Sequence, residues 1–194
     1  MRLKQAVWKL TIVMALTEVL LVFTSWLLSA MMIPGVRPIL STEGIRWFFV
    51  NFTTMMATPV LVSLMLVAMA LGSLWRSGLW QRPQTYRDRT ARRTVLILLV
   101  VYVAVVLSLS VIPHAVLLSA TGRLLPSPFS RALLPVMAFG LLLLSSVYGL
   151  LSGRLTSLSS VCSSMSYGIE TCSPLFVLYV FSVQLYESIR FVFL

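Results

Sequence analysis

Four polar side chains that could hold a proton or an ion lie within apolar stretches of this 194-residue chain: Glu18, Gln184, Glu187 and Arg190. Glu18 lies about eight residues, or ~12 Å at ~1.5 Å per residue, into the first apolar stretch. A carboxylate at that depth is too short to reach the headgroup region and is a candidate proton or cation site. The alternative is an uncharged Glu18 hydrogen-bonded to a neighbouring helix. We favour this alternative, because one isolated acid does not define a pathway.

The other three polar residues lie in the last apolar stretch. Gln184, Glu187 and Arg190 recur at intervals of three residues and therefore share one side of a helix. Glu187 and Arg190 can neutralise each other at the outer membrane interface, and we favour this interpretation over an ion site.

Residue types that support other chemistry are scarce. His114 is the only histidine, so no histidine-based metal cluster or relay can form within one chain, and we expect it at the membrane interface. Cys162 and Cys172 lack metal-ligand spacing and are expected to be reduced thiols. The sequence has no nucleophile with its base, no glycine-rich phosphate loop and no pair of catalytic carboxylates. We therefore expect no enzyme activity and no cofactor.

Composition defines the class of protein. The chain is 59% hydrophobic and only 10% charged, which is too apolar for a soluble domain of this size. Its net charge of +10 comes from basic residues beside apolar stretches, without interleaved base-stacking aromatic residues. We therefore expect the lipid bilayer as its partner, and no nucleic acid.

Five apolar stretches are long enough to cross a hydrocarbon core of ~30 Å as helices. The first exceeds the ~7 to 15 residues of a signal-peptide core and contains Glu18, so we expect it to be retained as an anchor. The predicted fold is an all-α integral membrane protein in which residues 1–194 form a single membrane domain. The predicted spans are residues 10–32, 55–75, 94–118, 132–151 and 174–194.

Two further segments have the pattern of amphipathic helices that lie at the interface. In the first, Trp47 suits the headgroup level and the apolar stripe consists of Ile45, Phe48, Phe49 and Phe52. In the second, at 155–170, most serines lie off a stripe formed by Leu158, Cys162, Met165 and Ile169. We predict an outer interfacial helix and an inner one.

Arginines predict the orientation of the chain. The segment 76–93 carries six arginines and one acid, Asp88, and basic segments that flank spans stay in the cytoplasm. It contains Gly78 and Pro83 but no apolar stripe, so we predict a connecting loop. We therefore expect a multi-pass protein of a bacterial inner membrane, with the N-terminus inside and the C-terminus outside. The arginines that set this topology are Arg76, Arg82, Arg87, Arg89, Arg92 and Arg93.

Small residues predict close helix packing. Ser145, Gly149 and Gly153 recur every four residues in and after the fourth predicted span, a pattern that lets helices associate. Ala68 and Gly72 form a similar pair in the second span. Because such faces are left uncovered in a five-span core, we expect at least a homodimer.

Several motifs resemble the AbgT-type p-aminobenzoyl-glutamate transporter family. They form two blocks that together cover most of the chain, and the resemblance continues through the serine-rich segment and the last stretch with Gln184. The motifs are ILSTEGIRW at 39–47, RSGL at 76–79, GRLLPSPF at 122–129, LP at 134–135 and VYGLLSG at 147–153.

The resemblance implies the scaffold of such a transporter without its transport domain. In that family two re-entrant hairpins supply the substrate and ion ligands, and the arginine segment stands here in place of the first hairpin. The chain also ends before the second hairpin. We therefore expect a scaffold or dimerisation core that does not transport alone, with a second chain supplying the transport domain. The alternative is a non-transporting scaffold or interaction subunit of an envelope complex.

Overall fold

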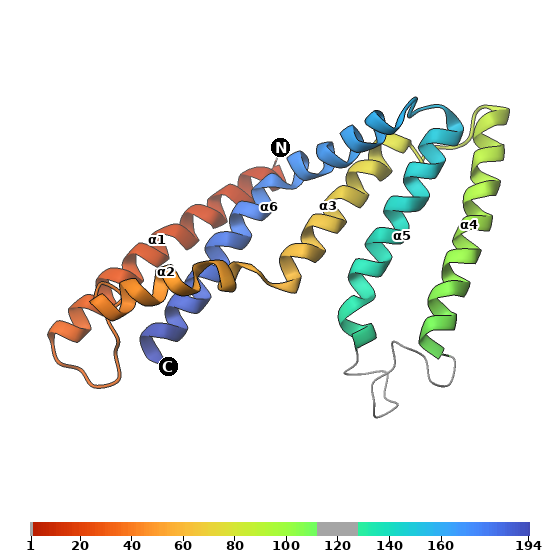
Figure 1. The fold of residues 1–194 in the computed structure, drawn as a ribbon. Helices are drawn as coiled ribbons and strands as arrows, with labels where there is room; N and C mark the ends of the chain where they lie inside the picture. The colour runs from red at the N-terminus through yellow and green to blue at the C-terminus, as the bar shows by residue number, and fades with distance from the viewer. Residues whose placement is uncertain (1, 112–127) are drawn as a thin grey trace. The chain divides into compact units, whose positions relative to one another are not determined.

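The computed structural model describes residues 2–111 and 128–194, and all regular structure in these two ranges is helical (Figure 1). Five of the six described helices are long and apolar enough to cross a membrane, so the predicted all-α, multi-pass membrane fold is confirmed. His114 and the end of the predicted third span lie outside the described residues. The helices are α1 (Arg2–Ala30), α2 (Thr42–Met56), α3 (Pro59–Ser77), α4 (Tyr86–Val111), α5 (Pro128–Ser152) and α6 (Leu158–Phe193).

Helix α2 is the short amphipathic helix predicted between the first two spans. The Ser41 hydroxyl caps it by accepting a hydrogen bond from the Gly44 amide at 3.0 Å, and Glu43 lies in its first turn. Ile45 and Phe49 are exposed, and the Phe48 ring packs edge-on against Phe49 with centroids 5.5 Å apart. An exposed apolar face on a capped helix fits a position at the membrane interface.

The arginine-rich segment is only partly a loop, which corrects the prediction for residues 76–93. Arg76 belongs to the last turn of α3, and α4 begins at Tyr86. The reason is a helix cap formed by the Asp88 side chain. The Asp88 carboxylate, in the first turn, accepts hydrogen bonds from the amides of Gln84 and Thr85, both at 3.3 Å. A carboxylate that satisfies free amides before a helix stabilises the helix start.

The predicted inner interfacial helix is not a separate element. The segment from 155 to 170 and the last predicted span form one helix, α6, which runs through Pro174. Proline removes one backbone hydrogen bond, but apolar helices tolerate it when neighbouring groups satisfy the freed carbonyl. Pro135 lies within α5 in the same way. Pro135 and Pro174 therefore do not mark helix boundaries, whereas Pro59 and Pro128 begin α3 and α5.

The chain divides into two compact units: unit 1 comprises Met1–Leu61 and Cys172–Leu194, and unit 2 comprises Val62–Thr171. The sequence pattern predicts one membrane domain and shows no sign of this division. Helix α6 contributes its first part to unit 2 and its remainder to unit 1.

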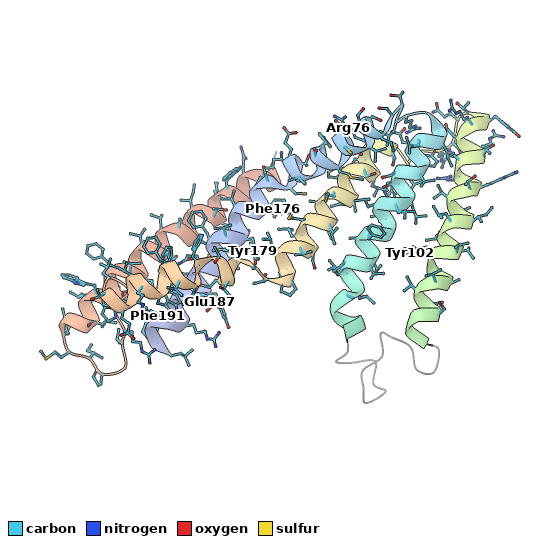
Figure 2. The ribbon with its side chains drawn as sticks, in the orientation of Figure 1. Arg76, Tyr102, Phe176, Tyr179, Glu187 and Phe191 are labelled. Atoms are coloured by element: carbon cyan, nitrogen blue, oxygen red, sulfur yellow. The ribbon has the colours of Figure 1, made fainter. Side chains whose placement is uncertain are left out.

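In unit 2, α4 packs against α5 through a small apolar core. The Tyr102 hydroxyl, labelled in Figure 2, donates a hydrogen bond from α4 to the Val136 carbonyl of α5 at 2.7 Å. The buried residues of this core are Ala91, Val95, Leu144 and Tyr148.

In unit 1, α2 is attached to α6 at two places. The Trp47 ring stacks on Phe191 with centroids 4.3 Å apart. The Tyr179 hydroxyl donates to the Met56 carbonyl at 3.1 Å and also lies within hydrogen-bond reach of the Thr58 hydroxyl. Tyr179 and Phe191 of α6 are labelled in Figure 2. These contacts hold the polar side of α2 against the second half of α6.

Candidate intramembrane polar site

Glu18 lies in a polar cluster between α1 and α6 of unit 1. The Ser188 hydroxyl donates a hydrogen bond of 2.6 Å to Glu18 Oε1 and accepts one of 3.3 Å from Gln184 Nε2. Ser188 is only 1% exposed, so these two hydrogen bonds lie within the packed contact of the two helices. The structure thus brings together two of the four predicted polar residues, Glu18 and Gln184.

The cluster has more acceptors than donors. Glu18 Oε2 and Gln184 Oε1 are buried and have no hydrogen-bond partner. Burying an unpaired polar atom is costly, and the cost rises when the atom belongs to an ionised group. Both oxygens therefore lack a hydrogen-bond donor.

The surrounding backbone holds this end of α1 and α6 together. The Ile39 amide, in the connection after α1, donates to the buried Ser25 hydroxyl of α1 at 3.4 Å. The Arg37 amide donates to the Val192 carbonyl near the end of α6 at 3.1 Å. The α1–α2 connection therefore bonds to both helices that carry the cluster.

Glu187 and Arg190 are not part of the cluster. They line a groove together with Phe191, whereas Gln184 bonds to Ser188. Arg190 Nη1 and Glu187 Oε2 are 4.0 Å apart, with side chains 63% and 24% exposed. An ion pair at this distance and exposure contributes little to stability. The structure thus gives Gln184 and the Glu187–Arg190 pair different partners.

The small residues of α5 pack within unit 2. Ser145 is fully buried, and its hydroxyl donates to Ser73 of α3 at 2.9 Å, while Ser146 lies 3.0 Å from the same Ser73 oxygen. A side chain added at Gly149 would meet Leu155 at 2.5 Å, so this glycine also serves a contact within the chain. Gly153 lies after α5 with a φ of +80°, which suits a glycine that ends a helix.

The closest approach of backbones in unit 2 joins α3 to the first part of α6. A Cβ atom built on Gly168 would lie 2.0 Å from the Ala68 carbonyl oxygen, and one on Gly72 would lie 2.4 Å from the Gly168 amide nitrogen. Only glycine fits on both sides of such a contact, which is typical of tightly packed membrane helices. Ala68 and Gly72 were predicted as packing residues, but Gly168 was not, because the helix predicted at 155–170 was placed at the membrane interface and not against α3.

Basic residues contact one another's segments at one end of unit 2, where α3 and α5 end and α4 and α6 begin. The Arg76 guanidinium lies 5.0 Å from the centre of the Tyr167 ring, and Arg87 Nε donates to the Leu151 carbonyl at 3.0 Å. Arg154 Nη1 donates to Gln81 Oε1 at 2.8 Å. The other arginines of the predicted topology-setting group are Arg82, Arg89, Arg92 and Arg93.

Sequence reasoning missed Ser188 and Ser73, the two hydroxyls at the centre of the polar contacts. Ser188 lies one turn after Gln184, so an i, i+4 search around Gln184 would have found it. Ser73 follows Gly72 directly and could have been grouped with the small residues. Within the described ranges, no group of three or more histidine, cysteine or acidic side chains could hold a metal ion.

No protein-family model, curated protein or solved structure matches this chain.

Proposed function

We propose that this chain is a membrane scaffold that resembles the dimerisation core of the AbgT-type transporters and does not move a solute by itself. One observation carries the proposal: Ser188 joins the deepest acid, Glu18, to α6 at 2.6 Å. The carboxylate thereby occupies a helix–helix contact. Polar side chains bonded across helices in this way act in packing.

The buried serines of unit 2 support the same interpretation. Ser73, Ser145 and Ser146 are bonded to one another between α3 and α5, at exposures of 0%, 0% and 9%. Their hydroxyl groups hydrogen-bond to one another inside the helix contact. A substrate site at the membrane midplane, in contrast, needs convergent polar groups that stay open to a ligand.

The experiment is reconstitution of the purified chain in liposomes, with entrapped reporters for protons and sodium and with radiolabelled p-aminobenzoyl-glutamate outside. We expect fluxes equal to those of empty liposomes, both for the native chain and for Glu18→Gln. Substrate-dependent uptake that is lost in Glu18→Gln, while Ile12→Val keeps it, would overturn the proposal. Ile12 is an exposed residue of the same helix, α1, at 57%.

The proposal includes an orientation, with the N-terminus and the basic end of unit 2 in the cytoplasm of a bacterial cell. After replacement of both native cysteines by serine, Gln84→Cys should resist a membrane-impermeant thiol reagent in intact cells. Leu40→Cys, in the exposed α1–α2 connection, should react. Labelling of position 84 and protection of position 40 would contradict this orientation.

The proposal also includes a homodimer. An apolar groove of about 540 Å³ between α3, α4 and α5 of unit 2 offers a surface for another helix. Its lining includes Ala70, Tyr102, Met137 and Gly140. Single-molecule photobleaching in dilute liposomes should show two steps per particle. A single photobleaching step per particle, for the native chain and for a Met137→Trp variant alike, would show a monomer and contradict the homodimer.

A further inference from the structure

A groove of about 760 Å³ runs between α2 and the last turns of α6 in unit 1. Its floor includes the stacked rings of Trp47 and Phe191. Figure 2 shows Glu187 and Phe191 on these turns of α6, beside α2. The charged residues of its lining are two arginines and two glutamates: Arg37, Glu43, Glu187 and Arg190.

The groove carries equal numbers of positive and negative side chains, and these are weakly paired. In the part of the chain that the structure describes, Arg190 and Glu187 form the one ion pair within 4.0 Å, and they stand at that limit. Arg37 and Glu43 are exposed, and neither side chain has a hydrogen bond or ion pair within the described residues. A ligand with one negative and one positive group would find a partner for each. A purely anionic ligand would face two carboxylates.

The exposed side chains of α2 indicate the depth of the groove in a bilayer. Helix α2 exposes apolar side chains, with Phe49 at 76% and Val50 at 66%, which places that face in the acyl boundary. The polar face of α2 and the end of the apolar helix α6 then lie at headgroup depth. Trp47 suits the same level, and an aromatic ring face attracts an ammonium group.

We propose that this groove binds the headgroup of a zwitterionic phospholipid of the phosphatidylethanolamine class. Arg37 and Arg190 hold the phosphate, because guanidinium groups donate paired hydrogen bonds to its oxygens. Glu43, Glu187 and the Trp47 ring hold the ammonium group. The acyl chains follow the exposed apolar face of α2 into the bilayer. This lipid site is independent of the scaffold role and of the Glu18 cluster.

The test is native mass spectrometry of the full chain in detergent, titrated with phosphatidylethanolamine or with phosphatidylglycerol of identical acyl chains. The native chain should bind phosphatidylethanolamine more tightly. The double variant Arg37→Ala/Arg190→Ala should lose about tenfold or more of that affinity, since two charge-assisted contacts are removed. Arg46→Ala is the matched control, because Arg46 is exposed on α2 and does not line the groove.

A second variant tests the charge balance itself. Glu43→Gln/Glu187→Gln leaves two arginines without carboxylates and should reverse the preference in favour of phosphatidylglycerol. Soluble phosphoethanolamine at millimolar concentration should not displace the lipid. The proposal fails if the native chain shows no headgroup preference, if Arg46→Ala weakens binding as much as the double variant, or if the glutamine variant keeps the native preference. Displacement by soluble phosphoethanolamine would show that the groove binds a free headgroup and not a lipid.

Discussion

The serine network of unit 2 and the Glu18 cluster of unit 1 both place polar side chains between membrane helices, yet they differ in how fully those side chains are bonded. The Ser73 hydroxyl contacts both Ser145 and Ser146, and the single proton of the Ser145 hydroxyl has two acceptors in reach, Ser73 and the Leu142 carbonyl of its own helix. The Glu18 cluster leaves two buried oxygens without a donor.

The difference follows from the chemistry of the side chains. A hydroxyl is both donor and acceptor and can turn to a carbonyl one turn earlier in its own helix. A carboxylate only accepts, and its two oxygens need donors from elsewhere. Serines therefore pack membrane helices at low cost, whereas Glu18 depends on one neighbour, Ser188.

The largest effect is expected where backbones touch in unit 2. Gly168→Leu would force a side chain into the Ala68 carbonyl, 2.0 Å from the position of its Cβ atom. We expect a loss of about 3 kcal/mol in the free energy of unfolding, measured by SDS titration in mixed micelles. The control is Ser163→Leu, at an exposed position of the same helix. Equal stability of the two variants would show that this approach of α3 and α6 is absent.

A smaller effect is expected in the serine network. Ser73→Ala removes the hydroxyl that both Ser145 and Ser146 contact, and hydrogen bonds between membrane helices contribute about 0.6 to 1.7 kcal/mol. The same SDS titration should show a loss in that range. Ser108→Ala should cost less, because Ser108 is exposed and bonds to the Val105 carbonyl of its own helix. A Ser73→Ala variant as stable as Ser108→Ala would show that the serine network contributes no more to stability than an isolated serine.

The smallest effect is expected at the basic end of unit 2. Arg87 Nε donates to the Leu151 carbonyl near the end of α5, so Arg87→Ala should cost about 0.5 kcal/mol, as for other cations at helix C-termini. The loss should shrink in 1 M salt, where surface electrostatic interactions are screened. Arg93→Ala, also exposed on α4, serves as the reference. A salt-independent loss would mean that Arg87 acts through packing.

The existence of the helices could be predicted from sequence, because five apolar stretches of sufficient length leave few other structures in a membrane. Their bounds could not. The Asp88 cap extends α4 into the arginine segment, and α6 continues through Pro174. Both depend on which neighbours satisfy individual backbone groups, and hydropathy carries no such information.

The candidate residues could be named from sequence, but their partners could not. Glu18 was expected to bond to a neighbouring helix, and the structure places Ser188 of α6 there. Gln184 and Glu187 lie three residues apart, yet one joins the cluster and the other lines the groove. Which way each residue faces depends on how α1 and α2 pack on α6, and that packing is not visible in a periodic pattern.

The central claim is that Glu18 acts in packing through Ser188, and a double-mutant cycle on these two residues tests it most directly. Ser188→Ala alone should cost about 2 kcal/mol in the free energy of unfolding, since it leaves a buried carboxyl group without its donor. In a Glu18→Met background the same change should cost less, because only the hydrogen bond from Gln184 Nε2 to Ser188 is then lost. An equal cost of Ser188→Ala in both backgrounds would contradict the account.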